Sequence, residues 1–176
     1  GENAGSYPLQ APPAGSLHVQ KSCEVRPLAG AKHKHYDFVM VFLFCYTKKM
    51  KTILVDAISG LILNDGTLQN EMYELLETYP NSKLVLTGAN DEQWKQFNLD
   101  ISPYEVFTLK HNPDKTDPKY FEILLSKYSL TTDDVVYFEH SHEAAKSAES
   151  VGIKTYYYDD MKQDIPALKN FLDSAL

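Results

Sequence analysis

Residues 51–68 read KTILVDAISGLILNDGTL and contain two aspartates with different surroundings. The first, Asp56, ends the continuous apolar run at 51–57, which is typical of a strand buried in a parallel sheet. The second, Asp65, stands in the Asn-Asp-Gly string at 64–66 between two apolar segments, a strong signal for a tight hairpin turn. We therefore expect Asp56 at the carboxyl end of a strand. We expect Asp65 on an exposed turn, where it is a poor candidate for a nucleophile.

Segments with strand and helix patterns alternate from this stretch to the last residue. Apolar runs are separated by stretches whose apolar residues recur at helical spacing. This order predicts an α/β fold with a parallel sheet and helices on both of its faces. The expected strands are 51–57, 82–90, 104–110, 133–141 and 154–159, and the expected helices are 69–80, 90–99, 117–130, 141–153 and 165–176.

Polar side chains follow three of the expected strands. Asp56 ends the first, Thr87 the second, and Glu139, His140 and Ser141 the fourth. In parallel α/β sheets, ligands bind outside the carboxyl ends of the strands. These side chains are therefore the candidates for a binding or catalytic site.

The composition limits the class of partner. The chain has 176 residues, enough for one domain with a hydrophobic core, and a formal net charge of −7. That charge argues against nucleic acid or an anionic membrane as the main partner. The two cysteines, Cys23 and Cys45, cannot build a disulfide framework, which is consistent with a cytoplasmic protein.

The chain divides near Met50 into an N-terminal extension, 1–49, and a domain, 50–176. The extension contains an apolar run at 38–47, which is too short to span a bilayer. One strand is the simplest interpretation of this run, and it could add to the sheet edge or join two chains. Two questions stay open: whether Met50 is the native start, and what the oligomeric state is.

Four segments of the domain match one family in order and spacing. They are ILVDAISG (53–60), KLVLTGAN (83–90), KTDPKYF (115–121) and VVYFEHSHEAAKSAESVGIKT (135–155). The domain resembles the haloacid dehalogenase-like (HAD) hydrolases, a superfamily of mostly phosphatases with a Rossmann-like core. The turn at 61–69 matches the family's small flap hairpin, and no insertion is long enough for a cap domain.

The resemblance implies roles for particular residues. Asp56 would be the nucleophile that forms an aspartyl-phosphate, and Lys115 would pair with Asp56 and the phosphoryl group. Substrate contacts would come from the Thr87 hydroxyl, the Gly88 and Ala89 amides, and Ser141. A magnesium ion would be held by the Asp56 and Glu139 carboxylates and the Ile58 main-chain carbonyl.

Two positions depart from the family's pattern. Ile58 stands where the phosphatases usually carry a second aspartate as general acid and base, a loss worth roughly 10²–10⁴-fold in rate. His140 stands where another carboxylate is usual, and histidine is a poor magnesium ligand. An enzyme with these departures is expected to prefer good leaving groups, such as acyl or aryl phosphates.

Three functions remain open at this point. The first is a capless phosphatase acting on a phosphorylated small molecule or macromolecule. The second is a catalytically silent HAD-fold binding module that uses the same cleft. The third is a haloacid dehalogenase, although neither the extra arginine nor the helical cap of those enzymes is matched. The named side chains also have ordinary structural readings: Asp56 as a turn cap, and Lys115 and Glu139 as solvated surface charges.

Overall fold

The computed structural model of the chain describes residues 49–176. The apolar run at 38–47 lies outside the described residues, so its strand assignment and the division near Met50 remain predictions. The strands are β1 (Thr52–Asp56), β2 (Lys83–Thr87), β3 (Glu105–Thr108), β4 (Val135–Glu139) and β5 (Lys154–Tyr157). The α-helices are α1 (Asn70–Glu77), α2 (Asp91–Gln96), α3 (Pro118–Lys127), α4 (His142–Ser150) and α5 (Ile165–Ala175), with short 3-10 helices at Leu99–Ile101 and Thr132–Asp134.

The five strands form one sheet in the order β3-β2-β1-β4-β5, and every pair is parallel. β1 is the central strand, and its apolar residues are buried because both faces of the sheet are covered. Alternation along the strand sends Ile53 and Val55 into one hydrophobic core and Leu54 into the other. The predicted parallel, Rossmann-like α/β sheet is confirmed.

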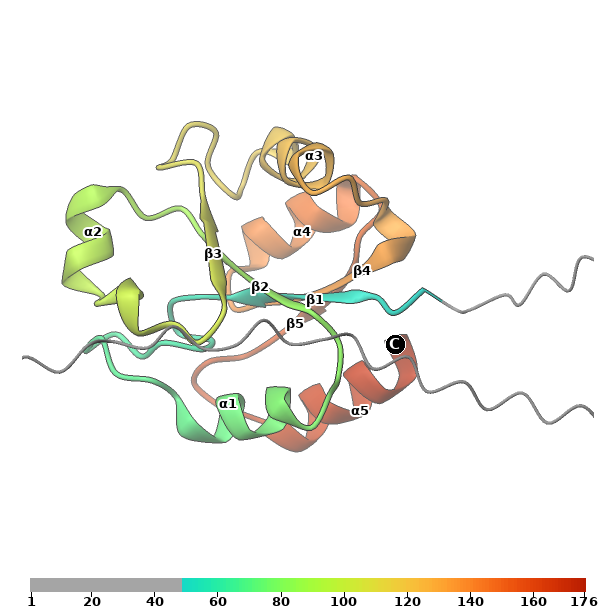
Figure 1. The fold of residues 1–176 in the computed structure, drawn as a ribbon, viewed down its shortest axis with the longest axis horizontal. Helices are drawn as coiled ribbons and strands as arrows, with labels where there is room; N and C mark the ends of the chain where they lie inside the picture. The colour runs from blue at the N-terminus through green and yellow to red at the C-terminus, as the bar shows by residue number, and fades with distance from the viewer. Residues whose placement is uncertain (1–48) are drawn as a thin grey trace, which may run out of the picture. The chain divides into compact units, whose positions relative to one another are not determined.

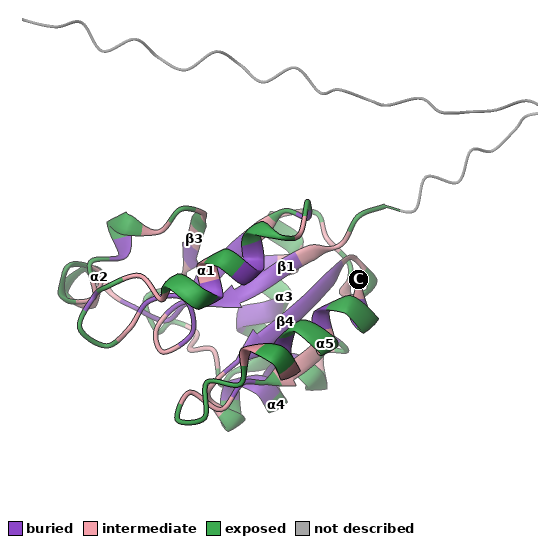
Figure 2. Cartoon of the chain, turned by 90° about the horizontal axis from the view of Figure 1, so that it is seen from below, coloured by how far each residue is buried: buried purple, intermediate pink, exposed green. Residues whose placement is uncertain are grey.

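Helices cover both faces of this sheet (Figure 1). α1 and α5 lie on one face and contribute Met72, Leu76, Leu168 and Leu172 to its core. α3 and α4 lie on the opposite face, whose core includes Tyr120, Phe121, Leu124 and Ala148. Figure 2 shows the result: the inner strands β1 and β4 are buried, whereas each helix is exposed along its outer side.

The helix boundaries follow from local chemistry. Asp117 caps α3 by accepting a hydrogen bond from the Lys119 amide, and Pro118 occupies the first turn, where its missing N–H costs nothing. α4 ends before Gly152, whose φ of +93° is the left-handed conformation that glycine adopts without strain.

The segment at 61–69 forms a tight turn with little regular strand structure. The Leu63 amide donates to the Thr67 carbonyl at 2.8 Å, and Ile62 and Leu68 form an isolated antiparallel bridge. Asp65 is exposed on this turn, where its carboxylate accepts from the Thr67 amide and hydroxyl. Asp65 is therefore a turn residue, as predicted, and the expected flap is a single-bridge hairpin.

The expected strand at 133–141 is shorter in the structure. Thr131 and Asp134 form a reciprocal capping arrangement that bends the chain into a 3-10 turn before β4 begins.

Among residues 49–176, no helix is both long enough and apolar enough to cross a membrane.

We predict that Leu54→Ala destabilises the domain by about 2–5 kcal/mol, because it opens a cavity beneath the central strand where the surroundings cannot collapse. Urea unfolding followed by circular dichroism measures the change. Ile123→Ala, which shortens an exposed side chain on α3, is the control and is expected to stay within about 0.5 kcal/mol of wild type. Equal losses in the two variants would contradict this description of the core.

Candidate functional site

The candidate site lies at the carboxyl ends of β1, β2 and β4. From β1 the chain moves outward to β2 and β3, then returns to β4 on the other side of β1. Such a reversal of strand order opens a crevice between two neighbouring strands. Since Val55 is paired with Phe138, the next residues, Asp56 and Glu139, end adjacent strands at this crevice.

The loop after β1 turns back tightly behind Asp56. The Leu61 amide donates to the Asp56 carbonyl at 3.1 Å. A Cβ atom added to Gly60 would lie only 2.4 Å from the same carbonyl oxygen, so this turn requires glycine. The turn leaves the Asp56 side chain facing the crevice.

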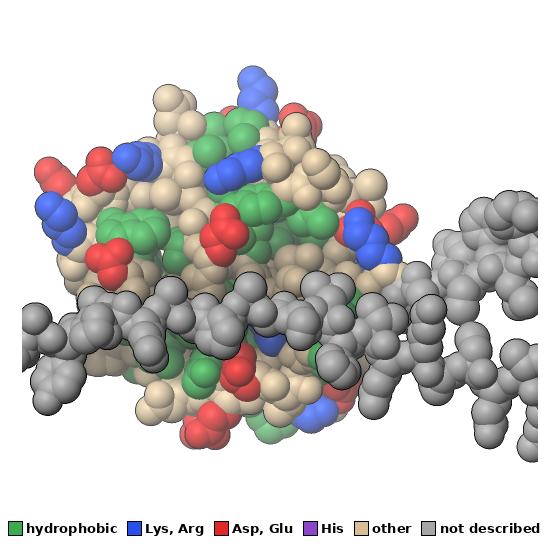
Figure 3. Space-filling model, viewed as in Figure 1, with side chains coloured by type: hydrophobic (Ala, Val, Ile, Leu, Met, Phe, Trp, Pro, Cys, Tyr) green, Lys and Arg blue, Asp and Glu red, His purple; other side chains and the backbone are tan. Residues whose placement is uncertain are grey.

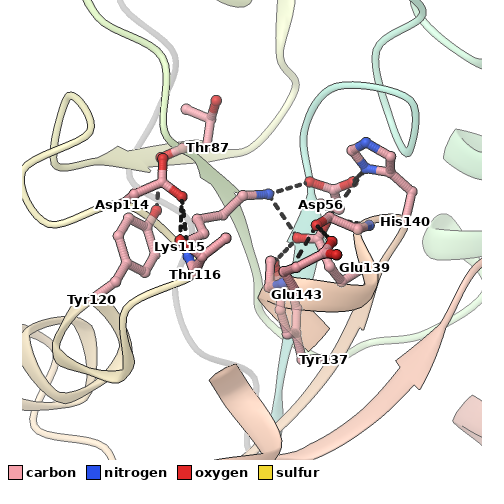
Figure 4. A network of polar contacts seen from close by, with 12 residues as sticks. Asp56, Thr87, Asp114, Lys115, Thr116, Tyr120, Tyr137, Glu139, His140 and Glu143 are labelled. Atoms are coloured by element: carbon pink, nitrogen blue, oxygen red, sulfur yellow. Dashed lines mark hydrogen bonds and ion pairs between the residues drawn. The ribbon is translucent and has the colours of Figure 1, made fainter. Parts of the chain in front are cut away.

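Lys115 connects the two buried carboxylates (Figure 4). Its Nζ atom lies 2.6 Å from Asp56 Oδ1 and 2.6 Å from Glu139 Oε2. Asp56 is 1% exposed and Glu139 is fully buried, so the interpretation of Glu139 as a surface acid is wrong. Lys115 reaches them from the segment between β3 and α3, where the resemblance expects the family's lysine.

His140 provides a second cation for the same pair. Its Nδ1 atom contacts Asp56 Oδ2 and lies 3.1 Å from Glu139 Oε1. Two carboxylates are thus balanced by an ammonium and, when protonated, an imidazolium. Figure 4 shows Lys115 and His140 approaching Asp56 from different sides.

Glu139 is held by further donors. The Tyr137 hydroxyl donates to Oε2, and the Ser141 amide donates to Oε1 at 2.8 Å. A carboxylate with this many donors is fixed in position, which suits a side chain that orients others.

Burial and mutual charge set the pKa values in this cluster. Hydrogen bonds to Asp56 and then to Glu139 raise the pKa of His140 to about 10, against the effect of burial. Burial also opposes the charge of Lys115, but attraction by Asp56 and Glu139 outweighs it and holds its pKa above the usual range. Both cations are therefore charged at neutral pH.

The two carboxyl groups are shifted in opposite directions. Burial favours the neutral acid in both, but Lys115 and the hydrogen bond from His140 hold the pKa of Glu139 well below its usual range. Burial and the charge of Glu139 raise the pKa of Asp56. Asp56 is therefore the first of the pair to take up a proton as the pH falls.

The loop after β2 supplies the phosphate-binding candidates. The Thr87 Oγ1 atom accepts from the Ala89 amide at 3.1 Å, which leaves its own proton available to a ligand. The Tyr120 hydroxyl donates to the Thr87 carbonyl at 2.8 Å and ties this loop to α3. The predicted contact through the Ala89 amide would have to share that N–H with Thr87.

A cavity of about 260 Å³ joins these groups. It is lined by Asp56, Ile58, Thr87, Gly88, Ala89, Gln93, Phe97, His111, Asp114, Lys115 and His140. Seven of the residues singled out from the sequence are in this set, including Ile58, whose side chain offers no proton. Ser141 is not, because its hydroxyl accepts from the Ala144 amide at 3.3 Å as the N-cap of α4.

Four lining residues were not predicted: Gln93, Phe97, His111 and Asp114. The last two lie just ahead of Lys115 in the string LKHNPDK, residues 109–115. A histidine four residues before the predicted lysine is a signal that the sequence carried.

The acidic cluster has the donors for a divalent cation. One ligand atom from each of Asp56, Glu139 and His140 falls within 4.8 Å of the other two. The carboxylate oxygens suit magnesium, whereas the imidazole suits softer metals. His140 already contacts both carboxylates, so a magnesium ion fits only if that ring moves, and at 31% side-chain exposure it faces the solvent in part.

No family model and no curated protein matches this chain, whereas several solved structures are similar to it in fold. One similar chain is a mutant of a HAD family enzyme from Bacteroides thetaiotaomicron in complex with magnesium and inorganic phosphate, at 14% identity and a TM-score of 0.46 over 61% of this chain and 93% of that one. Another is the core domain of a candidate phosphoglycolate phosphatase from Streptococcus pneumoniae, at 15% identity and a TM-score of 0.49 over 71% and 96%. A third is a haloacid dehalogenase-like protein of unknown function from Agrobacterium tumefaciens, at 16% identity and a TM-score of 0.41 over 60% and 61%. With every TM-score below 0.5, we assign roles from this chain's own geometry.

The raised pKa of His140 predicts a pH-dependent contribution to stability. A group with a raised folded-state pKa stabilises the fold fully below its unfolded pKa, here 6.5, and loses this effect as the pH rises through about 10. His140→Gln is therefore expected to destabilise most near pH 6.5 and progressively less toward pH 10. Urea unfolding of wild type and variant across this range measures the difference.

The control for this experiment is His142→Gln, which replaces an exposed histidine outside the cluster. A difference between wild type and His140→Gln that stays constant or grows between pH 6.5 and 10 would contradict the assigned ion pairs.

Proposed function

We propose that this protein is a HAD-like hydrolase that removes a phosphoryl group through a covalent intermediate on Asp56. One observation carries the proposal. The buried Asp56 carboxylate contacts Lys115 at 2.6 Å and opens onto a cavity that Thr87 and Gly88 also line. A nucleophile, a cation and hydrogen-bond donors for an anion therefore meet at one crevice.

The chemistry follows from these groups. An Asp56 oxygen attacks phosphorus, the bond to the leaving oxygen breaks, and its electron pair departs with the leaving group. Lys115 and the Thr87 hydroxyl stabilise the charge on the phosphoryl oxygens. Water then attacks the aspartyl-phosphate at phosphorus, releasing inorganic phosphate and restoring the carboxylate.

The substrate class follows from Ile58 and from the size of the cavity. Ile58 cannot protonate a departing oxygen, which favours acyl phosphates and activated aryl phosphates such as para-nitrophenyl phosphate, whose leaving groups are stable as anions. A cavity of about 260 Å³ holds a phosphoryl group and a few further atoms, so a larger substrate would extend into the solvent.

Surface charge supports a small phosphorylated compound over nucleic acid. Acidic and basic side chains are interspersed on the face seen in Figure 3, and the chain carries a net charge of −7. We also place the protein in the cytoplasm, because residues 50–176 contain no cysteine.

Magnesium is the metal that we propose for this site. The Asp56 and Glu139 carboxylates and the Ile58 carbonyl would hold it, after His140 leaves the space between the two acids. When bound, it would neutralise charge on the phosphoryl group. Both Asp56 and Ile58 line the cavity, with Glu139 adjoining Asp56.

A catalytically silent binding module is the second candidate, and one contact favours it. The His140 ring engages both carboxylates, so the cluster is neutral in charge without a metal. A site of this kind could bind a phosphorylated ligand through Lys115 and the loop after β2 without cleaving it.

We predict that wild-type protein releases phosphate from acetyl phosphate and para-nitrophenyl phosphate in the presence of magnesium. Asp56→Asn is expected to lose this turnover, because an amide cannot form the acyl-phosphate. Colorimetric phosphate release with and without metal measures both. Asp65→Asn, which alters the exposed turn aspartate, should retain wild-type rates.

Binding of a phosphate mimic separates the two candidates. Beryllofluoride with magnesium should raise the melting temperature of wild type and leave that of Asp56→Asn unchanged. If wild type neither turns over the substrates nor responds to beryllofluoride, the hydrolase proposal fails. Stabilisation by inorganic phosphate alone would then favour the binding module.

We predict that His140→Asp tightens magnesium binding by at least about tenfold, because it replaces a competing cation with an oxygen ligand. Isothermal titration with magnesium chloride compares wild type, His140→Asp and the uncharged His140→Gln. We expect the order Asp, then Gln, then wild type. Equal affinities in all three would show that the metal does not use the space held by His140.

A further inference from the structure

His111 lies on the same cavity as the proposed nucleophile and has no role in the chemistry above. It belongs to the segment between β3 and α3, four residues before Lys115. The proposed reaction lacks a group that can protonate a departing oxygen, since Ile58 cannot. The contacts of His111 indicate whether it could be this missing proton donor.

Both ring nitrogens of His111 face oxygen atoms. Nδ1 lies 2.7 Å from Asp114 Oδ2, and Nε2 lies 2.6 Å from Gln93 Oε1. A carboxylate can only accept while it is ionised, and the hydrogen bond from His111 lowers the pKa of Asp114. Nδ1 therefore donates to Asp114.

The orientation of the Gln93 amide decides the role of Nε2. Gln93 is the third residue of α2, and its Oε1 atom accepts from the Asn90 amide at 3.1 Å in the capping box of that helix. An amide nitrogen could not accept from Asn90, so the oxygen is the atom that faces His111. Nε2 therefore faces an acceptor as well, so each ring nitrogen of His111 lies against an oxygen atom.

The ring also lies against the proposed phosphate-binding loop. A Cβ atom added to Gly88 would stand 2.9 Å from both Cε1 and Nδ1 of His111. A ligand seated on that loop is thus next to the imidazole. The main chain of Lys110 and His111 is left-handed, with φ of +52° and +62°, a conformation that non-glycine residues adopt only when their surroundings impose it.

We propose that His111 is the proton donor to the leaving group, in place of the missing aspartate at Ile58. This inference rests on the proposed function. Asp114 keeps its bond to Nδ1 and orients the ring, while Nε2, whose partner is a neutral amide, turns its proton to the substrate. Asp114 is a positioning residue in this scheme.

The protons balance over the two steps. As Asp56 attacks phosphorus, the bond to the leaving oxygen breaks and that oxygen takes the Nε2 proton, leaving His111 neutral. The neutral ring then accepts a proton from the water that attacks the aspartyl-phosphate, which returns His111 to its doubly protonated form. His111 therefore extends the substrates from good leaving groups to poorer ones.

Leaving-group dependence tests the proposal. Acetyl phosphate needs no proton on its leaving group, whereas phenyl phosphate releases a basic phenolate. His111→Gln is expected to lower turnover of phenyl phosphate by about 10²–10⁴-fold and to leave that of acetyl phosphate within a few-fold of wild type. Asp114→Asn should cause a smaller loss in the same direction, and His142→Gln, outside the cavity, should change neither rate.

Each other outcome has a defined meaning. Equal losses of turnover with the two substrates in His111→Gln would assign the ring a structural role, and unchanged turnover would exclude any role. Either result overturns this inference and leaves the proposed function standing. If wild type turns over neither substrate, the proposed function itself fails and the proton donor role with it.

Nitrogen NMR of the histidine rings gives a readout that is independent of turnover. At pH 7, with inorganic phosphate present, His111 is expected to show two protonated ring nitrogens, and Asp114→Asn should reduce that fraction. The spectrum of His111→Gln assigns the signal. A singly protonated ring in wild type would overturn the inference, whatever the activity.

Discussion

The contact of Lys115 with Asp56 and Glu139 is the interaction on which the rest of this site depends. Two carboxylates buried at the ends of adjacent strands would repel each other and lose their hydration, a cost of several kcal/mol per ion. Lys115 lies 2.6 Å from both and makes their burial tolerable. The lysine comes from a segment that must reach from the edge of the sheet to its centre. The backbone between β3 and α3 is therefore shaped by this requirement, and the same segment brings His111 to the cavity.

Two histidines of this site are associated with acidic residues that the family's pattern has and this chain lacks. His140 contacts the carboxylates at a position where a further carboxylate is usual, and His111 lies above the loop after β2 while Ile58 offers no proton. A cation near the carboxylates lowers the need for a metal to balance their charge. Under the proposals made above, a second imidazole supplies the proton that the missing aspartate would have given. In this cavity, histidines thus balance charge and supply a proton, two roles that the family's pattern gives to a metal ion and an aspartate.

Much of this arrangement could be predicted from the sequence, because strands and strand ends have local signatures. The apolar run before Asp56 and the alternation of strands with helices predicted the sheet. Thr87 was expected at the end of a strand, and the resemblance paired Lys115 with Asp56. The burial of Glu139 was not predictable, since the residues around it do not show what covers the strand end. Gln93 and His111 were missed for a related reason: a helix start and a left-handed loop bring them together across 18 residues, and neither pattern is periodic. Ser141 was expected to contact the substrate, but its hydroxyl caps α4. The sequence was compatible with both roles, because a serine that follows an acidic residue can also begin a helix.

The close approach of the His111 ring to Gly88 has a consequence for how this chain can change over generations. A Cβ atom at position 88 would collide with the imidazole in its present place, so a change at position 88 depends on the residue at position 111. An alanine at 88 would become acceptable only after a smaller residue had replaced the histidine, and the reverse path would require glycine to be restored first. Related chains are therefore expected to lack one combination, a side chain larger than glycine at position 88 together with histidine at position 111. That missing combination offers a way to recognise this variety of site from an alignment.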